Sequence, residues 1–324
     1  HAGPGSGEDE ALTRTVLAPL VEATAEACGG FDWDDAAFGR SYAELERSLF
    51  GERRAYAAIA PLVGISVGAQ VELGSGVRVR AAAQGELAAH WPEAQGLLPA
   101  GFGREPDRLC VLELECPLPP AEPDPPDAPG ELADAVTALR LATAAPLAAG
   151  PVLFERLDWR PFGIRPMLPI AATQPAGEES RLDPFRGRLA LDLLERVRSA
   201  DEDPELAEAL DRWELSLFAD DPFRSEQLRE ALAALLGGGD GLWAAALRAS
   251  VLLGETGRDR ADTLERLRGL AHGEAAGDEA ADAVRRALVE ALLHGDRARL
   301  VEALDEALVG LRPRPAGYYA ALAS

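Results

Sequence analysis

The sequence predicts an α+β protein, in which a mixed α/β N-terminal region precedes an all-α C-terminal domain. Two patterns support this prediction. Apolar and polar residues alternate in 71–80 and 109–116, as in half-buried strands, whereas nearly all of the chain after Pro184 has the spacing of amphipathic helices. Between these patterns, residues 117–129 hold seven prolines, so we expect an acidic loop there that neither pairs in a sheet nor continues a helix.

The N-terminal region begins with two predicted helices. Apolar residues at helical spacing indicate the first over residues 9–28, where Pro19 can kink or delay its start. The second starts near Asp34 and places four large residues on one face: Phe38, Tyr42, Leu45 and Leu49. The acidic residues Asp32, Asp34 and Asp35 fit helix capping better than a Mg²⁺ or Ca²⁺ site, because they lack the spacing of a calcium loop.

Strands follow in the middle of the region. Residues 71–80 predict a hairpin that turns at Gly74, Ser75 and Gly76, with alternate residues buried. Residues 109–116 predict another strand, whose side chains on one face are Cys110, Leu112 and Leu114. After the proline-rich segment we expect one helix and two extended segments, over residues 131–145, 152–159 and 164–170.

Seven helices are expected after Pro184, separated by short breaks rich in glycine or containing proline. They cover residues 185–199, 204–218, 223–236, 241–253, 259–271, 278–294 and 296–310. Such short connections favour antiparallel neighbours in a helical bundle. The expected organisation of the whole chain is a tag remnant, a mixed α/β region, a helical domain and a tail, over residues 1–8, 9–180, 181–312 and 313–324.

The charge of the chain limits its partners. Its basic residues are all arginine, 32 of them against 55 acidic residues, which gives a net charge of −23. This charge repels polyanions at long range and argues against bulk DNA binding. The absence of lysine excludes a Schiff base and a P-loop lysine. No uninterrupted apolar run approaches the roughly 18 residues needed to span a bilayer, so no membrane partner is expected.

Other familiar sites are missing from the sequence. There is no CxxC, HExxH or GxSxG motif, so neither a metal nor a cofactor is expected. The odd number of cysteines, three in all, predicts reduced thiols in a cytoplasmic protein rather than a disulfide framework. The five tryptophans are expected to be core and interface anchors rather than a stacking platform.

Histidine is scarce. When His1 is set aside with the tag remnant, only His90, His272 and His294 remain, the first expected in a surface loop and the last at a helix end. His272 follows a locally basic stretch of four arginines and three acidic residues: Arg258, Asp259, Arg260, Asp262, Glu265, Arg266 and Arg268. An arginine and a histidine on adjacent turns can hold a phosphate and move a proton beside it. A histidine that caps a helix C-terminus explains the same pattern.

Four stretches of the C-terminal helices can be compared with known families by their order and spacing: ALDRWELSLFADD (209–221), RSEQLREALAALL (224–236), LWAAALRASVLLGE (242–255) and RLRGLAHGEAAGDEAADAVRRALVEALL (266–293). In order and spacing they resemble the HEPN superfamily, especially the domain of ApeA-like anti-phage defence proteins. The resemblance covers about residues 185–312. It implies a helical bundle, often a homodimer with a composite site between the two copies.

The resemblance also implies an activity, that of a metal-independent RNase or an RNA-sensing effector in a bacterial defence or toxin system. The family's Arg-x4–6-His motif fits Arg266 and His272, with Arg268 as an alternative partner. By this resemblance, His272 acts as base toward a 2′-hydroxyl of the RNA and Arg266 holds the scissile phosphate. Leu267 and Ala233 stand where the family usually has a polar residue and often a glutamate. The alternative is therefore a non-catalytic interaction, scaffold or sensor protein that binds a protein partner.

Overall fold

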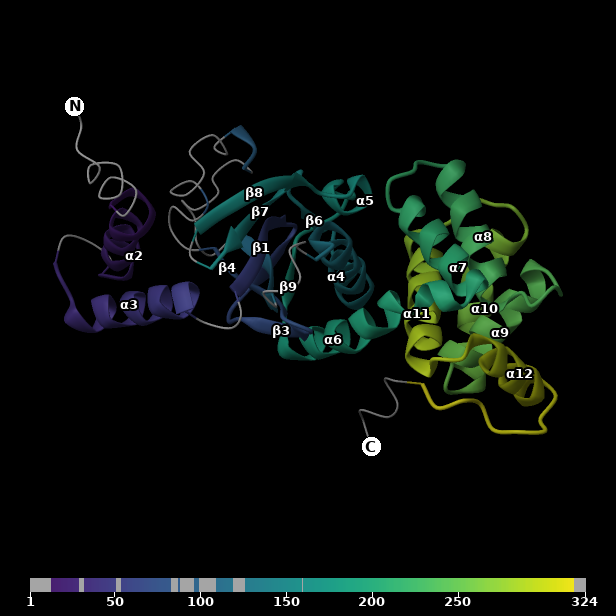
Figure 1. Cartoon of the computed structure of the whole chain (residues 1–324). Helices are drawn as coiled ribbons and strands as arrows, with labels where there is room; N and C mark the ends of the chain where they lie inside the picture. Colours follow the sequence, from purple (N-terminus) through teal and green to yellow (C-terminus); the bar gives the residue numbers. More distant parts are fainter. Residues whose placement is uncertain are drawn as a thin grey trace, which may run out of the picture.

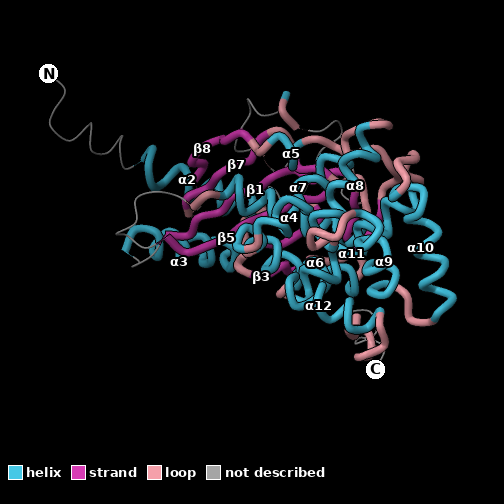
Figure 2. Tube along the Cα trace, turned by 90° about the vertical axis from the view of Figure 1, so that its right-hand side faces the viewer, coloured by secondary structure: helices cyan, strands magenta, loops and turns pink. Residues whose placement is uncertain are grey.

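The computed structural model describes residues 13–28, 32–50, 54–82, 87, 96–98, 109–118, 126–158 and 160–317. It confirms the predicted α+β class, because an antiparallel sheet forms the N-terminal half and helices form the C-terminal half (Figure 1). Figure 2 views the molecule from the side of the helical half. The expected tag remnant, the loop around His90 and the end of the expected tail lie outside the described residues.

Among the described residues, seven strands form the central sheet, in the order β3-β4-β5-β1-β7-β8, with β6 beside β1. All neighbouring strands are antiparallel. The strands are β1 (Arg54–Val63), β3 (Val71–Gly74), β4 (Val77–Ala81), β5 (Cys110–Leu118), β6 (Ala148–Ala149), β7 (Val152–Leu157) and β8 (Arg160–Pro166). A separate parallel pair joins β2 (Ile65–Val67) to β9 (Ser180–Leu182), and the expected border after residue 180 falls within β9.

The predicted hairpin is confirmed as β3 and β4. Val77 and Val79 of β4 are fully buried while Arg78 between them is partly exposed, as the alternation requires. At the turn, Gly76 has φ +78, and a Cβ there would lie 2.0 Å from the carbonyl oxygen of Glu115. Only glycine therefore allows β4 to approach β5 this closely.

The central strand β1 is an element that the sequence patterns missed. Its residues 54–63 form an alanine-rich apolar run without alternation, because both faces of the strand are buried. Tyr56 and Leu62 join the main core, whereas Ile59 packs on the opposite face in a small cluster with Val111 and Phe154. A run of this kind is compatible with a buried helix as well as a strand, so periodicity alone does not identify it.

Helices α4 (Ala128–Thr143) and α6 (Pro184–Arg198) pack on one another, and α6 also packs on β3 (Figure 1). The aspartates Asp127 and Asp183 cap their N-termini, by accepting hydrogen bonds from the backbone N–H of Gly130 and Arg186. The remaining helical elements of this half are the π-helical turn η1 (Thr13–Leu17), α2 (Ala18–Cys28), α3 (Asp35–Phe50) and α5 (Pro169–Ala172). The last of these replaces the end of the segment 164–170 that was expected to be extended.

The predicted loop over 117–129 is wrong at both of its ends, which belong to secondary structure. Strand β5 continues to Leu118, with Pro117 opposite Ala55 of β1, and α4 already begins at Ala128. Pro117 is tolerated because the pairing of β5 with β4 ends at Leu114, so this part of β5 has a neighbour on one side only.

All seven helices expected after Pro184 are present. After α6 they are α7 (Pro204–Ser216), α8 (Phe223–Leu236), α9 (Leu242–Leu253), α10 (Gly257–Ala271), α11 (Asp278–His294) and α12 (Arg297–Leu308). A short 3₁₀ turn, η3 (Ala200–Glu202), lies between α6 and α7. Helix α11 packs against α4 and α6 of the sheet half and against the other helices of the bundle. One continuous apolar core consequently runs from the sheet into the bundle.

A buried ion pair joins the two halves. Arg140 of α4 is 1% exposed, and its guanidinium lies 3.2 Å from the carboxylate of Glu214 on α7, which also accepts a hydrogen bond from Thr137. Arg140 donates further hydrogen bonds to three backbone carbonyls, those of Leu147, Ile170 and Thr173. Burial raises the pKa of Glu214, and the hydrogen bond from Thr137 and the charge of Arg140 oppose that shift.

The aromatic side chains differ in how far they are buried. Tyr42 of α3, on the same face as Phe38 as predicted, is 51% exposed, and the two ring centroids lie 6.0 Å apart. Trp213 is a core anchor, as predicted, whereas Trp33 and Trp243 are exposed. The cysteines Cys28, Cys110 and Cys116 are all free thiols, as expected.

Candidate functional site

Helix α10 carries the residues that the sequence singled out. It starts with a capping box, in which the Thr256 hydroxyl accepts from the backbone N–H of Asp259 and the Asp259 carboxylate accepts from the N–H of Thr256. The Asp259 carboxylate accepts hydrogen bonds from both the backbone N–H and the hydroxyl of Thr256, and these lower the pKa of Asp259. The helix ends where the N–H of His272 bonds the carbonyl of Arg268 and Gly273 takes φ +85.

The predicted pair, Arg266 and His272, lies on the last turns of α10, and each side chain contacts a different neighbour. The Arg266 guanidinium is 3.1 Å from the carboxylate of Glu279, at the start of α11. The alternative arginine, Arg268, pairs with Glu265 one turn earlier. No hydrogen bond or ion pair among the described residues joins either arginine to His272.

The side chain of His272 packs against an aromatic residue of the neighbouring helix. Its ring centroid lies 5.8 Å from that of Trp243, in the first turn of α9, and the rings are tilted by 31°. Trp243 is 45% exposed and His272 is exposed as well. His272 is therefore both a helix cap and one half of an exposed aromatic pair.

We call Trp243, Arg266, Arg268 and His272 the α9–α10 surface. The arginine side chains are 44% and 59% exposed, and the acids they contact, Glu279 and Glu265, are more exposed still. Exposed ion pairs of this kind contribute about 1 kcal/mol or less, so a phosphate can replace the carboxylate at small cost. Chemically, the surface offers stacking faces, two guanidiniums and one imidazole.

The sequence could not have revealed Trp243 as a partner of His272. Tryptophan at the start of an amphipathic helix is usually a packing residue, and its neighbours Ala245 and Ala246 are indeed buried. Leu267, which departs from the HEPN pattern, is fully buried and packs in the bundle core.

Another arginine of the helical bundle has a structural role. Arg248 of α9 is nearly buried, and its guanidinium binds both carboxylate oxygens of Asp305 on α12 at 2.7 and 2.8 Å. It also donates to the carbonyls of Leu236 and Gly237, at the end of α8. Arg248 therefore fastens three helices of the bundle together and is not available to a ligand.

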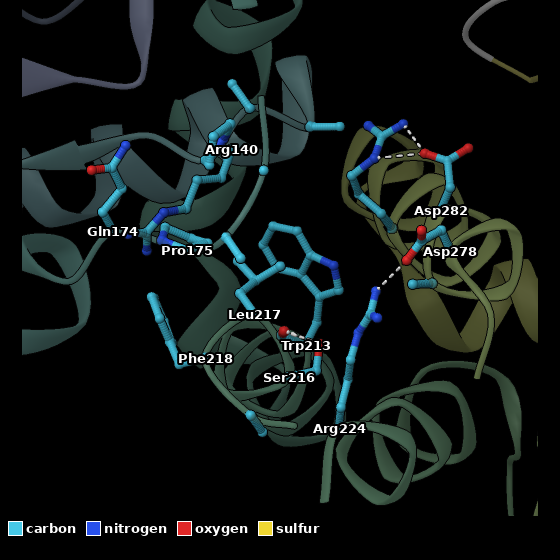
Figure 3. Close-up of a pocket in the computed structure, with 18 of the residues that line it drawn as sticks. Arg140, Gln174, Pro175, Trp213, Ser216, Leu217, Phe218, Arg224, Asp278 and Asp282 are labelled. Atoms are coloured by element: carbon cyan, nitrogen blue, oxygen red, sulfur yellow. Dashed lines mark hydrogen bonds and ion pairs between the residues drawn. The ribbon is translucent and has the colours of Figure 1, made fainter. Parts of the chain in front are cut away.

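A second candidate site is a cavity of about 740 Å³ where the sheet half meets the bundle (Figure 3). Its walls come from the end of α4, the loop after α5, the turn between α7 and α8, and the first half of α11. Trp213 and Arg140 lie deep in it, and Arg224, Asp278 and Asp282 stand toward the bundle side. No sequence pattern pointed to it, because its walls are distant along the chain.

Nothing among the described residues resembles a metal centre. No group of three or more His, Cys, Asp or Glu side chains is gathered there closely enough to hold an ion. Asp34 instead accepts a hydrogen bond from the backbone N–H of Ala36 at the start of α3, which confirms the capping interpretation. None of the described helices has the length and apolar character needed to cross a membrane.

The comparisons with known proteins return no relative. No family model, curated protein or solved structure matches this chain.

Proposed function

We propose that this protein is a HEPN-like, metal-independent RNase of a bacterial defence system, which binds single-stranded RNA at the α9–α10 surface. The observation that carries the proposal is the exposed Trp243–His272 ring pair at the end of the helix that carries Arg266 and Arg268. Aromatic faces beside guanidiniums are the chemistry that binds unpaired bases and the phosphates between them.

In this proposal each residue has one role. Trp243 stacks on a base, Arg266 exchanges Glu279 for the scissile phosphate, and His272 removes the proton of the attacking 2′-hydroxyl. The 2′-oxygen bonds to phosphorus as the P–O5′ bond breaks, and the leaving 5′-oxygen takes a proton from water. The charge of −23 restricts RNA contact to this local surface, because the rest of the molecule repels a polyanion. A homodimer would bring two such surfaces together in a composite site.

The test is cleavage of a mixed RNA pool in buffer with EDTA. We expect His272→Ala to lower the cleavage rate by roughly 100-fold, the usual contribution of a general base. His294→Ala is the matched control, because His294 is also exposed at a helix end. Equal cleavage by wild type and His272→Ala contradicts the mechanism.

A second candidate function is a non-catalytic scaffold or sensor that binds a protein partner. The ion pair between Arg266 and Glu279 favours it, because the predicted phosphate ligand already has a carboxylate partner. This candidate predicts that the wild type neither binds nor cuts RNA. Light scattering after gel filtration measures the oligomeric state in the same samples, and a monomer that cuts RNA contradicts this candidate.

A further inference from the structure

The cavity between the two halves has a mixed lining with an apolar part. Its deep wall is formed by aromatic and aliphatic side chains: Pro146, Pro175, Trp213, Leu217 and Phe218. Arg140 also lies there, but its guanidinium is bound to Glu214 and to backbone carbonyls, and it lies 5.2 Å from the ring centre of Phe218. The volume of about 740 Å³ is within the range of roughly 300 to 1,000 Å³ found for small-molecule sites.

One donor in this wall, the indole N–H of Trp213, has no partner among the described residues and is accessible from the cavity. The Trp213 residue as a whole is 2% exposed. Figure 3 shows the indole nitrogen on the side of the ring that faces α11, with no dashed line to a neighbour. The indole N–H therefore offers one hydrogen-bond donor to an acceptor atom in the cavity.

The mouth of the cavity is acidic. Four carboxylates line it, against two guanidiniums besides the buried Arg140: Asp220, Asp221, Asp278 and Asp282, with Arg224 and Arg285. Arg224 binds Asp278, and Arg285 binds Asp282 as well as the carbonyl of Leu141. Two negative charges therefore remain in excess at the mouth.

We propose that this cavity binds a small organic cation, an amine with an aromatic or other apolar body. The body would lie against Trp213 and Leu217, an acceptor atom of the ligand would take the indole N–H, and the positive nitrogen would face the carboxylates of the mouth. Coulomb attraction selects this sign of charge, because a phosphate or carboxylate would meet the excess negative charge of the mouth and of the whole chain.

This site is independent of RNA cleavage. It shares no residue with the α9–α10 surface, although Asp278 of the cavity and Glu279 beside Arg266 are neighbours on α11. If His272→Ala cleaves RNA as fast as wild type, the amine site is unaffected. If no amine binds, the RNase proposal is unaffected.

Titration of the full ¹⁵N-labelled chain with tyramine tests the proposal. Tyramine joins an aromatic ring and a hydroxyl to an ammonium group, and 4-hydroxyphenylacetate is its near-isostere with a carboxylate. We expect tyramine to bind saturably and to shift the indole N–H resonance of Trp213, which a Trp213→Phe variant assigns. The carboxylate analogue should produce no saturable shift.

Charge variants separate a site from diffuse attraction to an acidic protein. Asp220 is exposed and its carboxylate has no partner among the described residues, so Asp220→Asn should fold normally and weaken tyramine binding roughly fivefold. Glu302→Gln removes one exposed charge from α12, outside the cavity, and should leave the affinity unchanged.

Any of three results at saturating or measurable tyramine would overturn the proposal, and so would a fourth, the absence of binding. The three are an unshifted Trp213 indole resonance at saturating tyramine, equal binding of 4-hydroxyphenylacetate, and equal weakening by Asp220→Asn and Glu302→Gln. The fourth is the absence of any tyramine binding at millimolar concentration.

Discussion

The arginines at the junction of the two halves differ from those of α10 in what surrounds them. Arg140 is buried and bonded to Glu214 and three backbone carbonyls, whereas Arg266 is 44% exposed and has one exposed acid beside it. A buried charge must be fully paired, and removing its partner is costly; an exposed pair is close to neutral in energy. The same residue type therefore holds the fold in one region and remains available to a ligand in the other.

The largest effect is expected where the buried pair is broken. Arg140→Met leaves the carboxylate of Glu214 buried with Thr137 as its remaining side-chain partner, so we expect a loss of about 3 to 5 kcal/mol in the free energy of unfolding. Urea denaturation measures it. The double variant Arg140→Met/Glu214→Leu removes both charges and should recover most of the loss, and a single variant within about 1 kcal/mol of wild type would contradict the comparison.

A smaller effect is expected at Asp134 of α4, a half-buried acid. Burial, and secondarily the charge of Glu131, raise its pKa to about 6, against about 3.9 in an unfolded chain. The folded protein thus holds this proton more tightly, a contribution to stability that is complete below pH 4 and lost as pH rises through 6.

Asp134→Asn removes that pH dependence. Because Asp134 is partly exposed, we expect the variant to be more stable than wild type by roughly 1 kcal/mol at pH 8, with a smaller or reversed difference at pH 4.5. Thermal unfolding at both pH values measures the difference. A constant difference across this range would show that the carboxyl does not titrate as described.

The smallest effect on stability is expected at the exposed pair. Glu279→Gln should change the free energy of unfolding by less than about 1 kcal/mol. It frees Arg266 and removes a negative charge, so the affinity for single-stranded RNA should rise severalfold, measured by fluorescence anisotropy. Glu302→Gln makes the same change in net charge on α12, and an equal rise in that control would assign the effect to net charge instead of Arg266.

The helical half was predictable because its signals are local. Each helix from α6 to α12 has its own amphipathic spacing and its own break, and the expected boundaries lie within about two residues of those observed. Strand β1 was missed, since its alanine-rich run is buried on both faces by elements distant in the chain. The predicted loop over 117–129 began too early for the same reason, because only the pairing with β1 shows that β5 reaches Leu118.

For the candidate site, too, some features follow from the sequence and others only from the tertiary structure. The sequence alone determined that any phosphate chemistry belongs to arginine, that His272 ends a helix, and that Arg266 precedes it on the same helix. Only the tertiary structure decided that the rings of Trp243 and His272 lie together, that Glu279 forms an ion pair with Arg266, and that a cavity lies between the halves. Spacing along the chain encodes which residues share a helix, whereas burial and pairing depend on what packs against that helix from elsewhere.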